Sequence, residues 1–161
     1  MIRTILKLAA GAIALVFVAI QFVDPGYKFP ASNPEENLMV VENVPPQISS
    51  LLKRSCSDCH SNETAYPWYS RIAPLSWGMS EHIMLGREEL NFSEWKSYSK
   101  KRQIRKLKQM CDEVEEGEMP FYQYLWLHPD AALSSEDKSS LCDWSAIAVG
   151  KLKDVQKDET K

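Results

Sequence analysis

A chain of 161 residues has room for one domain of about 100 residues together with an anchor and a tail. Its net charge of −3, with no basic run interleaved with aromatic residues, argues against nucleic acid as a partner, and 44% apolar residues exclude wholesale disorder. A domain of this size buries only a modest core, which a large cofactor would help to fill.

The N-terminus is basic and then apolar. Arg3 and Lys7 precede the uncharged stretch 8–23, and the span 5–23 approaches the ~20 residues that cross a bilayer. Basic residues before the span predict a cytoplasmic N-terminus and an exported remainder. We therefore predict a single-pass bacterial inner-membrane anchor over 1–23, with the C-terminal domain in the periplasm. A cleaved signal peptide is the alternative, although no small-x-small cleavage site follows the apolar stretch.

Prolines interrupt the next segment and then mark a helix start. They predict an extended tether over 24–43. Pro45-Pro46 suits the first turn of a short helix that carries Cys56 and Cys59 on one face.

Helical periodicity continues to the end of the domain. We predict helices over 75–89, from an N-cap at Ser93 to about 116, and from the Ser134-x-x-Asp137 cap to about 149. No strand alternation is present. The fold class is therefore predicted to be all-α, with one domain over 44–150 and a charged flexible tail over 151–161.

The strongest motif is Cys56-Ser57-Asp58-Cys59-His60. Two thiols three residues apart can reach the two vinyl groups of a haem, and the adjacent imidazole can bind its iron. A thiol–disulfide redox site, half of a zinc site and a structural disulfide are the alternatives. The redox site usually lies beside a βαβ pattern, which is absent, and no second cysteine pair completes a zinc site. Together with the export signal, the motif predicts one covalently attached haem c.

The sixth iron position has several candidates. Met119 stands out because it follows Gly117, precedes Pro120 and lies in a loop that can present its sulfur without breaking a helix. We predict it as the distal ligand; the nitrogen alternative is His82, and an open position is the third. The remaining candidates are Met79, Met84, Met110 and His128.

Polar and aromatic side chains are candidates for the haem surroundings. Arg71, Arg87 and the indole of Trp77 could pair with the propionates, although a solvated face is an equal reading for each arginine. The aromatic residues expected to form an apolar wall around the haem are Tyr66, Trp68, Tyr69, Tyr122 and Trp126. The basic stretch 100–108 is either a partner-docking face or a solvated helix face.

The run from Cys56 to Trp95 resembles the haem-binding domain family, which consists of small exported bacterial proteins with one haem-attachment site. The resemblance is carried by the motif, by Tyr66-Pro67-Trp68-Tyr69, by Ile72-Ala73-Pro74, by Gly86-Arg87 and by Leu90-Asn91-Phe92-Ser93-Glu94-Trp95. It covers about residues 20–149 and implies covalent haem at Cys56 and Cys59 with His60 as the proximal ligand.

The pattern is also similar to class I cytochrome c. That likeness implies a proline carbonyl that accepts the hydrogen bond from Nδ1 of His60, with Pro74 favoured by its distance along the chain and Pro67 as runner-up.

The other two cysteines, Cys111 and Cys142, lie in predicted helices. An intrachain disulfide and buried free thiols are equal alternatives for them.

These features predict a membrane-tethered electron carrier with an unidentified redox partner protein, and not an enzyme. A peroxidase or ligand sensor with an open sixth position is the first alternative. A haem-free module that uses Cys56–Cys59 as a disulfide is the second.

Overall fold

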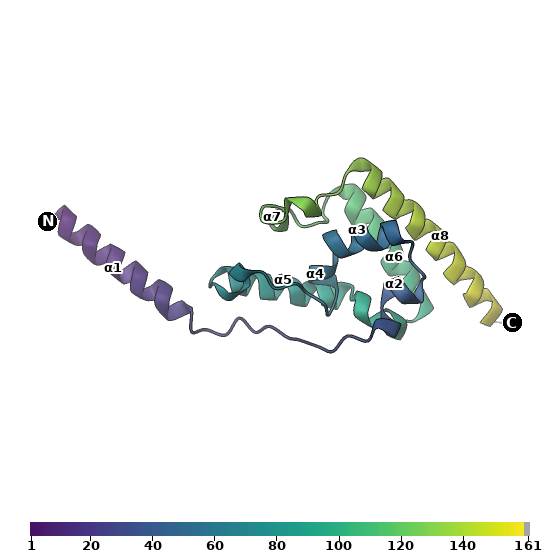
Figure 1. Cartoon of the computed structure of the whole chain (residues 1–161), viewed down its shortest axis with the longest axis horizontal. Helices are drawn as coiled ribbons and strands as arrows, with labels where there is room; N and C mark the ends of the chain where they lie inside the picture. Colours follow the sequence, from purple (N-terminus) through teal and green to yellow (C-terminus); the bar gives the residue numbers. More distant parts are fainter. Residues whose placement is uncertain (160–161) are drawn as a thin grey trace.

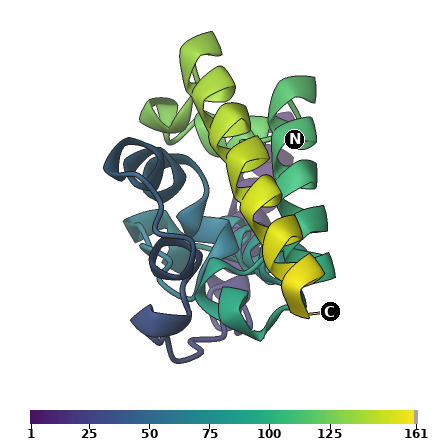
Figure 2. The same cartoon turned by 90° about the vertical axis from the view of Figure 1, so that its right-hand side faces the viewer.

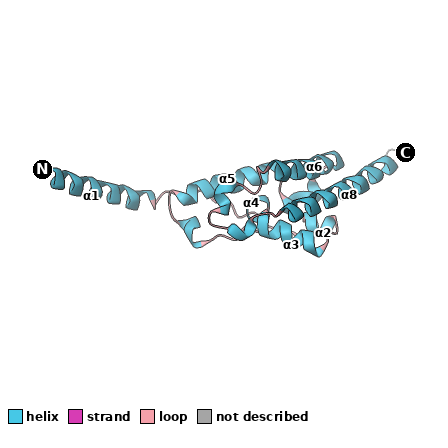
Figure 3. Ribbon diagram, turned by 90° about the horizontal axis from the view of Figure 1, so that it is seen from above, coloured by secondary structure: helices cyan, strands magenta, loops and turns pink. Residues whose placement is uncertain are grey.

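The computed structural model describes residues 1–159 and is built from helices joined by short loops, with no strand in that range (Figure 3). The all-α class is therefore confirmed. The α-helices are α1 Ile2–Ile20, α2 Leu38–Val41, α3 Pro46–Ser55, α4 Ser57–His60, α5 Leu75–Glu89, α6 Lys100–Glu116, α7 Tyr122–Leu125 and α8 Ser135–Glu159. The 3₁₀ helices are η1 Pro34–Glu36, η2 Trp68–Arg71, η3 Phe92–Ser97 and η4 Pro129–Ala131.

Helix α1 projects away from the rest of the chain (Figure 1). It buries none of its residues, and it is long and apolar enough to cross a membrane. Residues 8–20 of this helix carry no charge, and none of them is buried against the rest of the described chain.

The core lies where α6 and α8 run antiparallel, side by side (Figure 2). The buried side chains of Leu107 and Leu141 pack between these helices, and Trp95 of η3 lies in the same core. A disulfide joins Cys111 of α6 to Cys142 of α8, with their Cα atoms 5.1 Å apart. The two helices are thus linked covalently as well as by packing.

The extended tether predicted over 24–43 is wrong for its second half. Residues 34–41 form η1 and α2, which pack against η3. Leu38 is buried in the core, and the Trp95 indole donates a hydrogen bond to Glu42 at 2.8 Å. Pro34 starts η1 and the Asn37 side chain caps α2, and these short helices form because Leu38 has a core to enter.

The first half of the predicted tether, residues 24–33, is extended, and side-chain hydrogen bonds join this part of the chain to the domain. The Gln21 side chain donates to the Ala73 carbonyl at 3.1 Å and accepts from the Ala73 amide at 2.9 Å. Further along, Arg87 donates to the Lys28 carbonyl at 2.8 Å. The segment between α1 and η1 therefore lies along the domain (Figure 1).

Two predicted helix boundaries also change. Ser93 does not cap the third long helix: it lies in η3, and its hydroxyl accepts from the Asn62 amide, whereas Ser99 caps α6. The last helix starts at the predicted Ser134–Asp137 cap but continues to Glu159, with Leu152 buried. The predicted flexible tail is thus helical over 151–159, and residues 160–161 lie outside the described residues.

Candidate haem site

The motif Cys56–His60 forms a single turn at the end of α3. Buried Ile48 and Leu52 hold α3 in the core, and the chain then turns into α4, where the His60 amide donates to the Cys56 carbonyl at 3.0 Å. This turn places Cys56, Cys59 and His60 next to one another. Both thiols are free, since the disulfide is formed by the other cysteine pair.

Helix α5 packs directly on the turn at Gly86. A Cβ atom at this position would lie 2.7 Å from the Cys59 carbonyl oxygen, closer than real Cβ contacts occur. Only glycine lets the two backbones approach this closely. The contact brings the end of α5 over the ring of His60.

The His60 ring is oriented by the chain that follows α5. Its Nδ1 lies 3.0 Å from the Leu90 carbonyl oxygen. Because a carbonyl can only accept, Nδ1 carries the hydrogen, and Nε2 is the nitrogen left to bind a metal. Burial lowers the pKa of His60, while the backbone carbonyls of Leu90 and Gly86 oppose that effect. A neutral imidazole is the form that coordinates iron.

Leu90 replaces Pro74, which the class I likeness implied for this role, and it also replaces Pro67. The Pro74 carbonyl accepts from the Trp77 amide in the first turn of α5, at 3.1 Å, and the Pro67 carbonyl accepts from the Ser70 amide at 3.0 Å. Both prolines begin helices, and their carbonyls are used by those helices.

A cavity of about 210 Å³ lies beside Cys56 and His60. One face of α6 forms a wall, with residues at helical spacing: Lys106, Gln109, Met110, Glu113 and Val114. Met119 also borders this cavity, with 36% of its surface exposed.

Of the sequence candidates for the sixth ligand, Met110 and Met119 line the His60 cavity. Met84 lines a different cavity, and His82 packs against Phe121 with ring centroids 4.7 Å apart. The structure therefore brings Met110 and Met119, and not His82, to the same cavity as His60.

The donor set fits a haem. The free cysteine Cys56, the imidazole of His60 with Nε2 available and two methionines border one largely apolar space, and the second free cysteine, Cys59, lies in the same turn next to His60. Burial raises the pKa of Cys56 to about 12 and that of Cys59 to about 11, so both are protonated thiols before any attachment.

A buried cation lies in the same cavity. Lys106 has 9% of its side chain exposed, and its Nζ lies 3.0 Å from Glu89, whose own side chain is 78% exposed. Lys106 holds the pKa of Glu89 below its usual value. The pair joins α6 to the residue that precedes Leu90, so it lies next to the carbonyl that orients His60.

The arginines predicted to face the haem propionates lie elsewhere. Arg87 donates to the Ser61 carbonyl, the Lys28 carbonyl and the Thr64 hydroxyl at 2.8, 2.8 and 2.9 Å. It therefore joins the loop that follows the motif, called the motif loop below, to the connecting segment between α1 and η1. Arg71 lines a separate cavity of about 370 Å³. The indole nitrogen of Trp77 is buried without a hydrogen-bond partner, so this predicted residue still has a donor to offer.

The aromatic residues expected as a haem wall do not border the His60 cavity. Tyr66 packs against Tyr27, with centroids 4.9 Å apart, and Trp68, Tyr122 and Trp126 are exposed. The cavity wall comes instead from Phe92 and α6.

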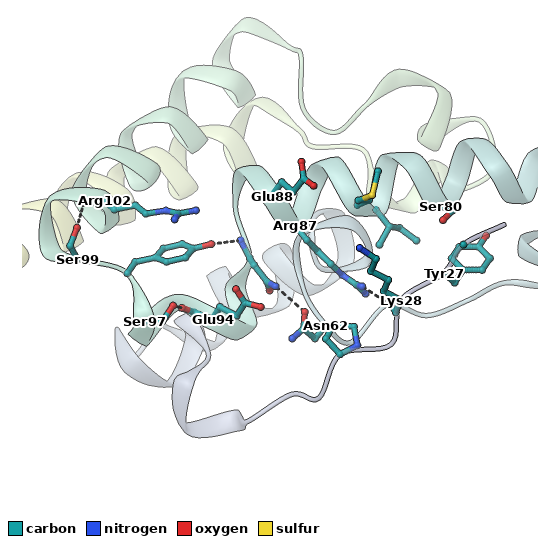
Figure 4. Close-up of a pocket in the computed structure, with 16 residues that line it drawn as sticks. Tyr27, Lys28, Asn62, Ser80, Arg87, Glu88, Glu94, Ser97, Ser99 and Arg102 are labelled. Carbon is teal, nitrogen blue, oxygen red and sulfur yellow. Dashed lines mark hydrogen bonds between the residues drawn. The ribbon is translucent and has the colours of Figure 1, made fainter. Parts of the chain in front are cut away.

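Another cavity, of about 600 Å³, lies between the segment that joins α1 to η1, α5 and the start of α6 (Figure 4). Arg87, Lys28 and Arg102 point into this region from three different elements (Figure 4). The Arg102 guanidinium lies 3.9 Å from the Tyr98 ring centroid. No cysteine or histidine lines this cavity, so it offers neither thiols for covalent attachment nor an imidazole ligand.

Sequence reasoning named Gly86 and Leu90 only as part of the family resemblance and gave neither of them a role at the site. A glycine inside a helical pattern is a signal for close approach and could have pointed to Gly86. Leu90 acts through its backbone carbonyl, which leaves no trace in residue type.

The comparisons with known proteins agree with the donor set. The family model described as haem-binding domain matches residues 15–147. No curated protein and no solved structure matches the chain. The match begins inside α1 and ends in α8, so it includes the connecting segment, the motif and the α6–α8 core. The chain belongs to the haem-binding domain family.

Proposed function

We propose that this protein is a membrane-tethered mono-haem c-type cytochrome that transfers electrons in the periplasm. The observation that carries the proposal is that Cys56, His60 and Met119 border one cavity, with Nδ1 of His60 already engaged. Haem c would supply an iron that cycles between ferric and ferrous states. The chain's own residues would hold it, orient it and tune its potential.

Attachment would use both thiols of the motif, and His60 would bind iron through Nε2. The Leu90 carbonyl fixes the ring angle and raises the basicity of the imidazole. The free thiols and the paired Cys111–Cys142 support this division of the four cysteines.

Met119 is the proposed distal ligand. It borders the His60 cavity from a loop, whereas Met110 is a buried core residue of α6. A thioether ligand stabilises ferrous iron and suits an electron carrier, because an iron with both axial positions filled has no site for a substrate.

Attachment can be tested with a pyridine haemochrome assay and haem staining on denaturing gels. The wild-type chain, produced in a host that matures c-type cytochromes, should retain haem on the gel, and replacement of both Cys56 and Cys59 by serine should abolish it. Replacement of Cys111 and Cys142 is the matched control and should leave the stain in place. Haem that survives loss of both motif cysteines would overturn covalent attachment.

The distal ligand separates an electron carrier from an enzyme or sensor. The ferric protein should show the weak near-infrared band of His/Met haem, and Met119→Ala should remove it, lower the potential and let ferrous iron bind carbon monoxide. Met110→Leu is the control. Loss of the band only in Met110→Leu would reassign the ligand to Met110. Ready carbon monoxide binding by the wild type would favour a peroxidase or sensor with an open sixth position.

The membrane location rests on α1, which has the length and apolar surface of a span. A periplasmic activity reporter fused after Lys161 should be active, and the protein should fractionate with membranes. A mature N-terminus after Val23 would show a cleaved signal peptide and overturn the tether.

A further inference from the structure

The loop that carries Met119 is anchored at its start by the end of α6. Gly117 ends this helix with φ 82°, a conformation that favours glycine. The amides of Glu118 and Met119 then both donate to the Glu113 carbonyl, at 3.0 and 3.1 Å. The near end of the loop is therefore held by backbone hydrogen bonds.

Beyond Met119 the loop has little apolar packing to hold it. Helix α7 contains no buried residue, and its Tyr122 is 58% exposed. The neighbouring Trp126 is 73% exposed. Hydrophobic burial, the usual force that keeps a short helix in place, is small here.

Phe121 at the start of α7 packs against His82, and a polar contact then ties α7 to the attachment motif itself. The Tyr124 hydroxyl donates to Oδ2 of Asp58 at 2.7 Å, and Asp58 lies between Cys56 and Cys59 in the chain. The other carboxylate oxygen of Asp58 accepts from the Ala65 amide at 2.9 Å. Both oxygens of Asp58 are therefore engaged, one by the loop after the motif and one by α7.

A second set of contacts supports the same residue. The Tyr124 ring stacks on His128 with centroids 4.2 Å apart and planes 12° apart. The Nε2 atom of His128 is hydrogen-bonded to the Tyr69 hydroxyl of η2. Burial and the Asp58 carboxylate raise the pKa of Tyr124, so its hydroxyl stays protonated and can donate.

We propose that Tyr124 and Asp58 are a pair of positioning residues that hold Met119 in place for the iron. The hydrogen bond couples the turn that attaches the haem to the loop that presents the distal ligand. The residues on the two sides of the iron are therefore held in a fixed position relative to each other. This inference rests on the proposed Met119 ligation.

The test compares Tyr124→Phe with Tyr122→Phe in the full-length, haem-loaded protein in detergent. Each variant removes one hydroxyl and no charge. A hydrogen bond to a charged acceptor is worth roughly a tenfold to hundredfold change in an equilibrium. We expect Tyr124→Phe to raise the fraction of iron with Met119 displaced by about that factor. The readouts are carbon monoxide binding to ferrous protein, the near-infrared ferric band and the midpoint potential, which should fall. Tyr122→Phe should match the wild type in all three.

Asp58→Asn is the second variant, and it keeps the proposal testable if Tyr124→Phe fails to accumulate. Asparagine keeps an acceptor for the Ala65 amide but puts an uncharged amide group opposite Tyr124, so the hydrogen bond to a charged acceptor is replaced by a weaker neutral one. Removal of an anion by itself raises the potential of a nearby iron, so carbon monoxide binding is the readout for this variant. If the two residues act together, the double variant should bind carbon monoxide no more readily than Tyr124→Phe alone.

The outcomes separate this inference from the proposal that it rests on. A wild type with the His/Met band, together with a Tyr124→Phe variant that matches Tyr122→Phe, would overturn the positioning role and leave Met119 as the ligand. A wild type without the band, or one that Met119→Ala does not change, would overturn both.

Discussion

Leu90 lies 30 residues beyond His60 in the chain, and its carbonyl oxygen lies 3.0 Å from Nδ1 of the His60 ring. The contact is possible because Gly86 lets α5 lie against the Cys59 backbone, and because the Leu90 amide donates to the Gly86 carbonyl at 2.9 Å. The orientation of the His60 imidazole is thus set by the C-terminal end of α5.

Gly86→Ala should reduce the free energy of unfolding by about 1–3 kcal/mol, because a Cβ would press on the Cys59 carbonyl and the backbone cannot yield cheaply. Gly78→Ala in the same helix is the matched control: its Cβ would meet open space, and the substitution should stabilise by about 0.4–1 kcal/mol. Denaturant titration of both variants checks this. Equal effects at the two positions would contradict the close approach.

The Lys106–Glu89 pair should tune the iron potential. Lys106→Met removes a buried cation and should lower the potential, because a nearby positive charge favours the ferrous state. Glu89→Gln leaves that cation uncompensated and should raise the potential. Redox titration of both variants gives the two signs, and the exposed Glu63→Gln, which has no contact with Lys106, serves as control. Shifts of the same sign in both variants would contradict a through-space effect.

The disulfide between α6 and α8 should contribute on the order of 3 kcal/mol, because it restricts the unfolded chain. Replacement of Cys111 and Cys142 by alanine should lower the denaturation midpoint by a corresponding amount and leave haem attachment intact. Mass spectrometry of the denatured, unreduced protein should find neither of these thiols available for alkylation. Two alkylated thiols at these positions would show that the bond is absent.

The raised pKa values of the motif thiols predict how the stability of the haem-free protein depends on pH. Burial raises the pKa of Cys56 from 9.0 to about 12 and that of Cys59 from 9.0 to about 11. The unfolded chain therefore releases these protons at lower pH than the folded chain, so the free energy of unfolding should fall as pH rises above about 9. Alkylation requires the thiolate and should be slower at pH 8 in the folded haem-free chain than in urea. Equal rates in the two states would contradict burial of the thiols.

Local patterns predicted the regular parts of the fold because their causes are local. The helix expected over 75–89 agrees with α5, and the Ser134–Asp137 cap starts α8 as its side chains require. Ser93 was wrongly predicted as the cap of the third long helix. Its hydroxyl accepts from the Asn62 amide, 31 residues away, and a capping pattern cannot reveal such a partner.

The site was predictable where side-chain chemistry defines it. Cys56, Cys59 and His60 form a motif that sequence alone can identify. The partner of Nδ1 is the backbone carbonyl of Leu90, which the C-terminal end of α5 places beside His60. Distance along the chain favoured Pro74 for this role, and that prediction was wrong. Arg87 has the right chemistry for a propionate, but the connecting segment and the motif loop occupy all of its nitrogens.

The paired hydrogen bonds between Gln21 and Ala73 join the end of α1 directly to the domain, without a flexible linker between them. With α1 in a bilayer, the haem would not be carried on a long flexible linker that lets it move toward its partner. It would be presented at one height and one tilt above the lipid surface. Encounter with a redox partner would then depend on lateral diffusion within the membrane plane and on the shape of the face turned outward, and a soluble partner would have to approach that face.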